Sequence, residues 1–258
     1  MKQKAWIKNF LKKYFPPAHA FSVRCSLVLR AFLRYGLDCN PLRLFWIVEP
    51  YTMVGHARLF NAYDLSQRCQ KEHIEGAFVE CGVWRGGCAA IMAAVATRHG
   101  ARRKTWLFDS FEGLPHPTEK DGEKAALYAK QNVTGELASI KINVGPLQDV
   151  ERLLFKILKL PRESVYAVKG WFQETLPQKK DQIGPIAILR MDGDWYESTK
   201  CILDNLYDSV IPGGYIIVDD YGSWEGCKKA VDDFFRARMQ PEIDFKMIDL
   251  AGLYFQKP

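Results

Sequence analysis

AFVECGVWRGGC, residues 77–88, is the stretch of the sequence that decides the fold, and the alanine-rich run 89–96 follows it directly. Its first residues are apolar, which is typical of a buried strand. The glycines indicate a tight turn, and the alanines favour a helix. A strand, a tight loop and a helix N-terminus in this order open the nucleotide-binding half of a doubly wound α/β fold. We therefore predict a Rossmann-like α/β fold built around this stretch.

The spacing of the glycines indicates which ligand the loop would bind. It is E-x-G-x-x-x-G-G, which differs from the G-x-G-x-x-G of dinucleotide-binding loops. Gly82 permits a sharp turn, and Gly86 lets a ligand approach bare backbone. Free N–H groups at a helix start bind a carboxylate as well as a phosphate, and Glu80 suits a ligand with an amino group. These features favour S-adenosylmethionine over NAD, and an ordinary βα turn without a ligand is the alternative.

The charge of the chain is uneven. The hydrophobic fraction of 48% is enough for a sizeable core, and the net charge is +6. Residues 1–50 hold nine Lys and Arg against only Asp38 and Glu49, whereas the remainder is nearly balanced. We therefore predict no nucleic-acid partner, because such a surface needs a broad excess of basic residues.

The cysteines and the apolar runs indicate the compartment. Seven cysteines are scattered without a C-x-x-C pair, which is typical of reduced thiols. No apolar run is long enough for a transmembrane helix, and the basic N-terminus lacks the unbroken apolar core of a signal peptide. We expect a cytoplasmic protein.

Residues 1–15 have the pattern of a basic amphipathic helix, with aromatic and aliphatic side chains at helical spacing and lysines mainly opposite. Such a helix packs on its own domain or on a dimer partner, which we favour, or contacts an anionic membrane surface. A second helical pattern follows at 21–35. We divide the chain into a basic helical extension, residues 1–50, and a main domain, residues 51–258.

The main domain alternates strands with helices. Four further strands are expected at 105–109, 165–170, 185–192 and 215–221, and a closing antiparallel hairpin at 245–249 and 253–256. Helices are expected at 56–72, 146–160, 199–209 and 224–238, a turn at 212–214, and a lid or short helices at 118–138. We predict a seven-stranded, mostly parallel sheet with helices on both faces and a C-terminal antiparallel hairpin.

Further cofactor-binding candidates follow the predicted strands. Asp109 ends the second strand, where an acid of a nucleoside-binding fold receives the ribose hydroxyls, and Ser110 directly after it is a further cofactor-binding candidate. Helix capping by Asp109 or Ser110 is the alternative. Gly170 and Trp171 follow the third strand, where adenine would lie, although an aromatic residue here also suits the core. The other candidates lie in the glycine loop or before the helix that precedes it: Met53, Arg85 and Cys88.

Two pairs of acids follow the fourth and fifth predicted strands, Asp192 with Asp194 and Asp219 with Asp220. The carboxyl ends of parallel strands face one crevice, so the four carboxylates should converge. Their mutual repulsion is relieved by a divalent cation, and oxygen ligands favour Mg²⁺ over zinc. We predict a Mg²⁺ site with the ligands Asp192, Asp219 and Asp220. Surface acids that cap helices are the alternative.

Five motifs occur in the order VECGVWRGG, LFDSFEGLP, KGWFQETLP, LRMDGDWYEST and IIVDDYG, and together they resemble the macrocin O-methyltransferase family over about residues 50–256. The resemblance implies a class I methyltransferase that depends on S-adenosylmethionine and Mg²⁺. It implies that Glu80, Gly82 and Asp109 hold the cofactor and that the metal is held by Asp192, Asp219 and Asp220. Catechol-type methyltransferases, which the chain also resembles, have a lysine base where this sequence has Trp195.

The expected reaction is transfer of a methyl group from S-adenosylmethionine to a hydroxyl of a small molecule or glycan, above all of a sugar or glycosylated natural product. Mg²⁺ lowers the pKa of the hydroxyl, and a carboxylate takes its proton. Asp192 is the first candidate for this catalytic base and Asp194 the second. The resemblance also suggests a homo-oligomer, a dimer or larger.

Two other function classes stay open. The D-x-D at 192–194 also suits a metal-dependent nucleotide-sugar glycosyltransferase, which would need neither Asp109 nor the acids at 219–220. A non-catalytic S-adenosylmethionine-binding module would need no set of metal ligands.

Overall fold

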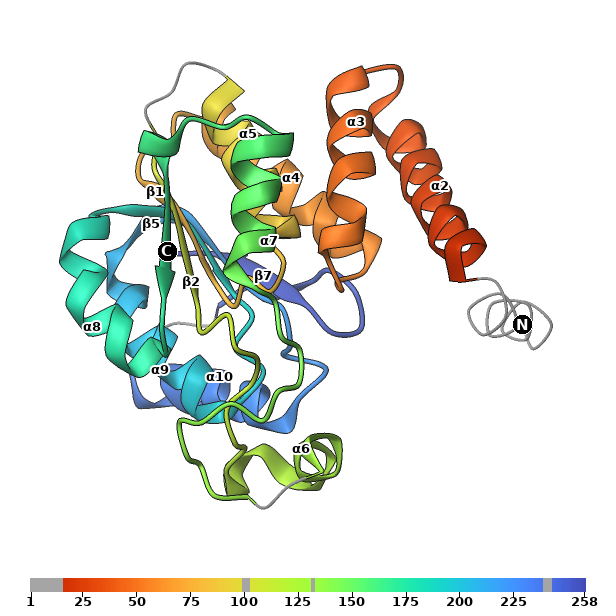
Figure 1. Ribbon diagram of the computed structural model, residues 1–258. Coiled ribbons are helices and arrows are strands. Elements are labelled where there is room, and N and C mark those ends of the chain that lie inside the picture. Colours follow the sequence, from red (N-terminus) through yellow and green to blue (C-terminus); the bar gives the residue numbers. More distant parts are fainter. Residues whose placement is uncertain (1–15, 99–102, 131–132, 239–242) are drawn as a thin grey trace.

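Seven strands within the described residues form one sheet, and Figure 1 shows helices on both of its faces. The computed structural model describes residues 16–98, 103–130, 133–238 and 243–258. The strands are β1 (Ala77–Cys81), β2 (Thr105–Asp109), β3 (Val165–Lys169), β4 (Ile186–Met191), β5 (Val210–Val218), β6 (Lys246–Met247) and β7 (Leu253–Gln256). Their order is β3-β2-β1-β4-β5-β7-β6. Strands β1 to β5 are parallel, and β7 is antiparallel to β5 and β6. The predicted fold class is confirmed.

The strand order reverses between β1 and β4. The chain runs outward from β1 to β2 and β3 and then returns to β4 on the other side of β1. Ligands of open α/β sheets bind outside the carboxyl ends of the strands at such a point. Every residue of β1 and β4 is buried, yet their register pairs Glu80 with Arg190. Two charged residues therefore lie opposite each other in the most buried part of the sheet.

Two layers of helices enclose the sheet. The helices are α2 (Pro16–Tyr35), α3 (Cys39–Val48), α4 (His56–Lys71), α5 (Gly87–Arg98), α6 (Gly122–Ala129), α7 (Leu147–Glu151), α8 (Phe172–Ile183), α9 (Tyr196–Leu206) and α10 (Glu225–Ala237). Phe78 of β1 belongs to a core cluster with residues of α4 and α5, and its neighbour Val79 belongs to a cluster with residues of α8, α9 and α10. Successive side chains of a strand point to opposite faces, so β1 contributes to both cores.

Several element boundaries differ from the prediction. β5 begins at Val210, so the residues 212–214 lie within the strand and not in a turn before it. Gly213 has φ +81°, and the pairing of β4 with β5 shifts here, as in a β-bulge. The helix expected at 146–160 is α7 followed by a π-helix at Arg152–Ile157, and α9 begins at Tyr196, earlier than expected.

Helices α2 and α3 join the core of the sheet domain. Leu27 of α2 and Phe45 of α3 are fully buried in the cluster that also contains residues of α4 and α5. Arg34 and Tyr35 at the end of α2 both bind the carboxylate of Asp64 on α4. These contacts attach both helices to the sheet domain at fixed positions.

Other expectations about the chain remain predictions. The amphipathic helix of residues 1–15 lies outside the described residues, and the division into residues 1–50 and 51–258 stays a prediction. All of the seven cysteines lie in the described ranges and are free thiols. Among the helices described, none has the length and apolar character needed to cross a membrane.

Candidate active site

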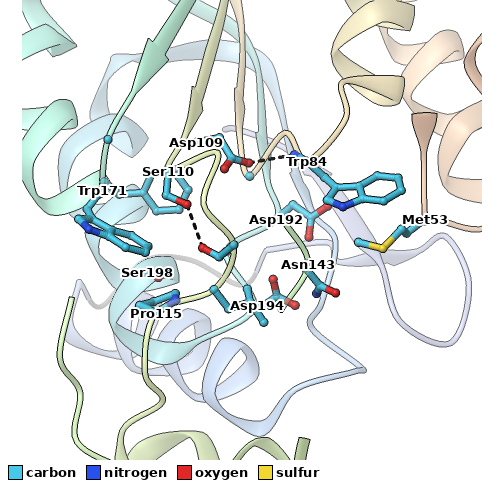
Figure 2. Close-up of a pocket in the computed structure, with 16 residues that line it drawn as sticks. Met53, Trp84, Asp109, Ser110, Pro115, Asn143, Trp171, Asp192, Asp194 and Ser198 are labelled. Carbon is cyan, nitrogen blue, oxygen red and sulfur yellow. Dashed lines mark hydrogen bonds between the residues drawn. The ribbon is translucent and has the colours of Figure 1, made fainter. Parts of the chain in front are cut away.

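A pocket opens at the carboxyl ends of β1 to β4, next to the reversal of the strand order (Figure 2). The predicted site residues that line it are Met53, Gly82, Asp109, Ser110, Gly170, Trp171, Asp192 and Asp194. The residues that complete the lining were not singled out from the sequence: Trp84, Gly113, Leu114, Pro115, Asn143, Phe172, Gly193 and Ser198. Most of these lie in irregular loops, where no periodic pattern announces which side chain faces a ligand.

The glycine loop after β1 is tightly packed. Gly82 has φ +87°, and a Cβ at this position would collide with the backbone carbonyl of Asp192. Such a backbone conformation favours glycine. A Cβ at Gly87 would lie 2.7 Å from the carbonyl oxygen of Tyr51. The loop is thus held between the turn after β4 and the chain before α4, and Trp84 extends from it to the pocket wall (Figure 2).

Asp109 organises this loop. One of its carboxylate oxygens accepts hydrogen bonds from the backbone N–H groups of Val83 (2.6 Å) and Trp84 (2.9 Å), and the other accepts one from Phe111 (2.6 Å). Burial raises the pKa of Asp109, although the three N–H donors oppose the rise. The carboxylate caps no helix but joins the loops after β1 and β2, and it lines the pocket at the place predicted for a ribose.

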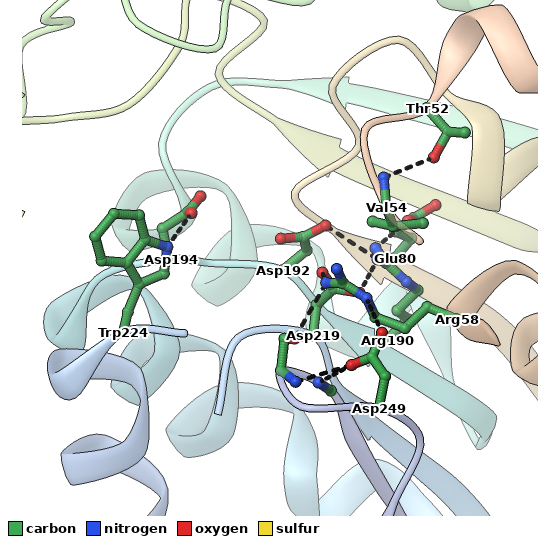
Figure 3. Close-up of polar contacts among 12 residues, drawn as sticks. Thr52, Val54, Arg58, Glu80, Arg190, Asp192, Asp194, Asp219, Trp224 and Asp249 are labelled. Atoms are coloured by element: carbon green, nitrogen blue, oxygen red, sulfur yellow. Dashed lines mark hydrogen bonds and ion pairs between the residues drawn. The ribbon is translucent and has the colours of Figure 1, made fainter. Parts of the chain in front are cut away.

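Arg190 is another residue of the site that no sequence motif indicated. Its guanidinium is 1% exposed and donates to Glu80 (2.5 Å), to Asp192 (3.0 Å) and to Asp219 (Figure 3). Arg58 of α4 donates to the other oxygen of Asp219. A single buried cation therefore joins the ends of β1, β4 and β5. The available signal was an arginine within the otherwise apolar strand IAILRM.

Glu80 keeps one carboxylate oxygen without a hydrogen-bond partner. Its Oε2 is buried and unpaired, whereas Oε1 accepts the bond from Arg190. Burial raises the pKa of Glu80 to about 8, against the lowering effect of Arg190. The side chain lines a small cavity beside the main pocket together with Met53 and Cys88. An unpaired buried acceptor at this place suits a ligand that carries an N–H donor.

Three carboxylates gather at the ends of β4 and β5. Asp192, Asp194 and Asp220 each offer an oxygen, and these atoms lie within 4.8 Å of one another. Asp219 was predicted as a ligand in place of Asp194, but both of its oxygens are bound by Arg58 and Arg190. The structure thus brings together two of the three predicted metal ligands and adds the second residue of the D-x-D.

Burial and mutual repulsion act on this group. The pKa values of Asp194 and Asp220 are raised well above the ordinary range, first by burial and then by the neighbouring carboxylates. Trp224 Nε1 donates a hydrogen bond to Asp194 Oδ1 (2.9 Å), whereas Oδ2 of Asp220 is buried without a partner. Oxygen ligands that are buried, close together and short of hydrogen bonds suit a hard divalent cation.

The segment between β2 and α7 closes one side of the pocket. Buried Trp195 donates from Nε1 to the carbonyl of Pro115 (3.0 Å), so the position of the lysine base in catechol-type enzymes is structural here. Buried Asp121 accepts a hydrogen bond from the backbone N–H of Tyr196 (2.6 Å). The short helices expected in this segment are present as η2 (Glu119–Asp121) and α6.

Two predicted cofactor residues lie away from both cavities. Arg85 pairs with Asp149 (2.8 Å) and donates to the carbonyl of Pro50 (3.2 Å). A Cβ at Gly86 would touch the side chain of Val150 at 3.2 Å. Both residues therefore attach the glycine loop to α7 and do not line the pocket.

Several known proteins are similar to this chain in sequence. The family model described as macrocin-O-methyltransferase (TylF) matches residues 42–257. The demethyldecarbamoylnovobiocin O-methyltransferase of Streptomyces niveus is 36% identical over 251 residues, 95% of this chain and 88% of that protein. The mycinamicin III 3''-O-methyltransferase of Micromonospora griseorubida is 31% identical over 208 residues, 80% and 78% of the two chains.

Two solved structures have a similar fold. The O-methyltransferase NovP superposes with a TM-score of 0.69 at 37% identity, over 80% of this chain and 82% of its own. CalS11, a calicheamicin methyltransferase, superposes with a TM-score of 0.62 over 93% of both chains at 19% identity, which supports the fold alone.

Proposed function

Because the chain belongs to the macrocin O-methyltransferase (TylF) family, we propose that this S-adenosylmethionine-dependent O-methyltransferase acts with Mg²⁺ on a hydroxyl of a sugar or glycosylated natural product. The observation that carries the proposal is the group of Asp192, Asp194 and Asp220 beside the pocket. The relatives named above act on demethyldecarbamoylnovobiocin and mycinamicin III, which supports a similar class of acceptor.

The cofactor would lie along the carboxyl ends of β1 to β3. The unpaired Oε2 of Glu80 suits the ammonium of the methionine part, since a buried acceptor gains most from a charged donor. Asp109 suits the ribose hydroxyls, because it lines the pocket beside the glycine loop. Trp171 and Phe172 line the far side and suit the adenine ring.

The carboxylate group suits Mg²⁺ because all of its donor atoms are oxygens. The residues that would hold Mg²⁺ are Asp192 and Asp220. Oδ2 of Asp220 has no hydrogen-bond partner and is therefore available to the ion. Bound there, the ion would lower the pKa of the acceptor hydroxyl and offset the repulsion among the acids.

Asp194 is the better candidate for the base. The sequence favoured Asp192, but Asp192 is tied to Arg190. Asp194 lines the pocket, its pKa is raised by burial, and Trp224 holds one oxygen while the other stays available. An ionised carboxylate that faces the pocket is in a position to take the proton of an acceptor hydroxyl.

Calorimetry and turnover test the proposal. S-adenosylmethionine is titrated into the protein in EDTA and then in Mg²⁺, and methyl transfer is measured on a panel of glycosylated natural products. We expect cofactor binding in both media and turnover only with Mg²⁺. Cofactor binding without any metal-dependent turnover on this panel would contradict the metal and acceptor assignment. Turnover of nucleotide sugars would favour the glycosyltransferase alternative.

A matched pair of variants tests the base. Asp194→Asn should lower kcat by a factor of about 10² to 10⁴ and leave cofactor affinity unchanged. Asp181→Asn, an exposed acid of α8, is the control and should behave as the unmodified protein. If Asp192→Asn abolished turnover while Asp194→Asn retained it, the base would be Asp192.

Homo-oligomerisation and a contact of residues 1–15 with a membrane surface stay predictions of the sequence. Sedimentation measurements on the full chain check the first of these.

A further inference from the structure

Among the described residues that line the pocket, Asn143 alone carries a side-chain amide. Figure 2 shows this amide on the same side of the pocket as Asp194, away from Asp109. The contacts proposed above for the cofactor run from Glu80 to Trp171 and do not include Asn143. A polar side chain on the side of the proposed base is in a position to contact the acceptor.

The backbone around Asn143 is held in place by two loops of the site. Asn143 has φ +57°, a left-handed conformation that asparagine adopts more readily than most residues. A Cβ at Gly145 would collide with the backbone of Trp84 in the glycine loop. The N–H of Leu114 donates to the carbonyl of Ile142 (2.9 Å). The amide therefore starts from a fixed backbone position at the pocket wall.

Tyr128 of α6 fixes the orientation of this amide. Its hydroxyl donates a hydrogen bond to Oδ1 of Asn143 (3.2 Å). Within the described part of the chain, Nδ2 of Asn143 donates to no protein group. An asparagine amide has one acceptor oxygen and one donor nitrogen, so the bond from Tyr128 leaves the donor for a ligand in the pocket.

One aromatic contact joins this amide to the proposed base. The rings of Tyr128 and Trp224 pack with their centroids 5.2 Å apart. Trp224 Nε1 donates to Asp194 Oδ1 (2.9 Å), as Figure 3 shows. Two side chains in contact with each other thus hold the two polar groups on this side of the pocket, Asn143 and Asp194. Such support keeps a binding group and a base at a fixed distance from each other.

We propose that Asn143 binds the acceptor and that Tyr128 is the positioning residue that orients its amide. Nδ2 of Asn143 donates to a sugar oxygen next to the hydroxyl that faces Asp194. The proposal rests on the proposed function and adds a requirement for its acceptor, a second oxygen beside the methylated hydroxyl. A site that hydrogen-bonds a substrate oxygen discriminates strongly against an analogue without it.

Titration of phenyl β-glucoside and its monodeoxy analogues tests the binding role, in the presence of Mg²⁺ and S-adenosylhomocysteine, which cannot donate a methyl group. Asn143→Gly removes the amide but keeps the backbone, because glycine adopts a positive φ without strain. The affinity for the glucoside should fall about tenfold. Lys141→Gly is the matched control, since Lys141 has φ +59° and a side chain that is 71% exposed, and its affinity should not change.

The deoxy analogues identify the bonded oxygen. One of them should bind the unmodified protein as weakly as the parent glucoside binds Asn143→Gly, and this variant should no longer discriminate between the two. In turnover with S-adenosylmethionine, Asn143→Gly should raise KM about tenfold with kcat nearly unchanged, because the bond is made in the ground state and the transition state alike.

A double-mutant cycle tests the positioning role. Tyr128→Phe keeps the ring and removes the hydroxyl, and it should weaken glucoside binding about threefold. In the Asn143→Gly background the same change should have no further effect, because Tyr128 acts through this amide. Additive losses would overturn the positioning role.

Several outcomes would overturn the acceptor role. Failure of the unmodified protein to bind the glucoside would do so, as would equal affinities of the unmodified protein and Asn143→Gly. Weakening of S-adenosylmethionine binding by Asn143→Gly to the same extent would assign the amide to the cofactor. Absence of methyl transfer, while glucoside binding still depends on Asn143, would contradict the proposed function alone. Methyl transfer with an unchanged KM in Asn143→Gly would contradict the acceptor role alone.

Discussion

Asp219 and Asp220 are adjacent acids at the end of one strand, and their surroundings give them different roles. Asp219 is bound by Arg58 and Arg190, while Asp220 joins Asp192 and has an oxygen without a partner. Neighbouring side chains at a strand end point to opposite sides. Two adjacent aspartates can therefore have different neighbours and different roles. At the scale of single residues, burial and the nearest countercharge decide whether a carboxylate supports the site or is available to a ligand.

Removal of Arg190 should destabilise the protein strongly. Arg190→Met leaves buried Glu80 without its countercharge and should lower the free energy of unfolding by about 3–5 kcal/mol. Arg190→Lys should recover part of this loss, because it retains the charge but not the forked geometry. Urea denaturation measures the change, and exposed Arg152→Met is the control. Equal losses in Arg190→Met and Arg152→Met would contradict the structural role of this cation.

The metal-free protein should lose stability as the pH rises from acid to neutral. The raised pKa values of Asp194 and Asp220 mean that the folded state keeps protons that the unfolded chain releases near the ordinary value of 3.8. Their contribution is favourable at low pH and declines from there towards the raised values. The urea midpoint in EDTA should therefore fall less with pH in Asp194→Asn than in the unmodified protein. Identical pH slopes in the two proteins would argue against the shift.

At the scale of elements, the glycine loop shows how a backbone position constrains the site. Gly82 is confined both by its positive φ and by the carbonyl of Asp192. The β-bulge at Gly213 has a positive φ without close contacts, since its nearest neighbour would be a side-chain atom 3.8 Å away. Both glycines have a positive φ, which favours glycine over other residues. Only Gly82 also connects two loops of the pocket.

A pair of alanine variants separates strain from collision. Gly36 has φ +65° and free space around it, so Gly36→Ala should cost only the strain of about 1–2 kcal/mol. Gly82→Ala adds a collision with the turn after β4 and should cost more. Because this turn leads to Asp194, the variant should also lose most methyl transfer. Thermal melting and turnover measure both effects, and equal melting temperatures of the two variants would contradict the prediction.

At the scale of the whole molecule, helices before the main domain belong to its core. Phe45 of α3 is fully buried among residues of α4 and α5, such as Phe60 and Ile91. The pocket is likewise assembled from loops between Met53 and Ser198. Both features depend on contacts between segments far apart in the sequence.

Truncation of Phe45 tests whether α3 folds together with the sheet. Phe45→Ala should lower the free energy of unfolding by about 3–5 kcal/mol, because it leaves a cavity in a fully packed core. Leu33→Ala on the exposed face of α2 is the control and should change it by about 0.5 kcal/mol at most. Urea unfolding should remain a single transition. Two separate transitions would instead support an independent extension.

The sequence by itself determined the order of strands and helices, the glycine loop and the acids at the strand ends. Apolar periodicity, turn residues and motif spacing are local properties, so neighbouring residues suffice to predict them. The tertiary structure alone decided which acids form a group, which of them Arg190 binds, and that Arg85 and Gly86 face α7. These outcomes depend on burial and on contacts across the sheet. A local sequence pattern does not show which distant side chains come into contact in the interior, where the low dielectric constant strengthens their interactions.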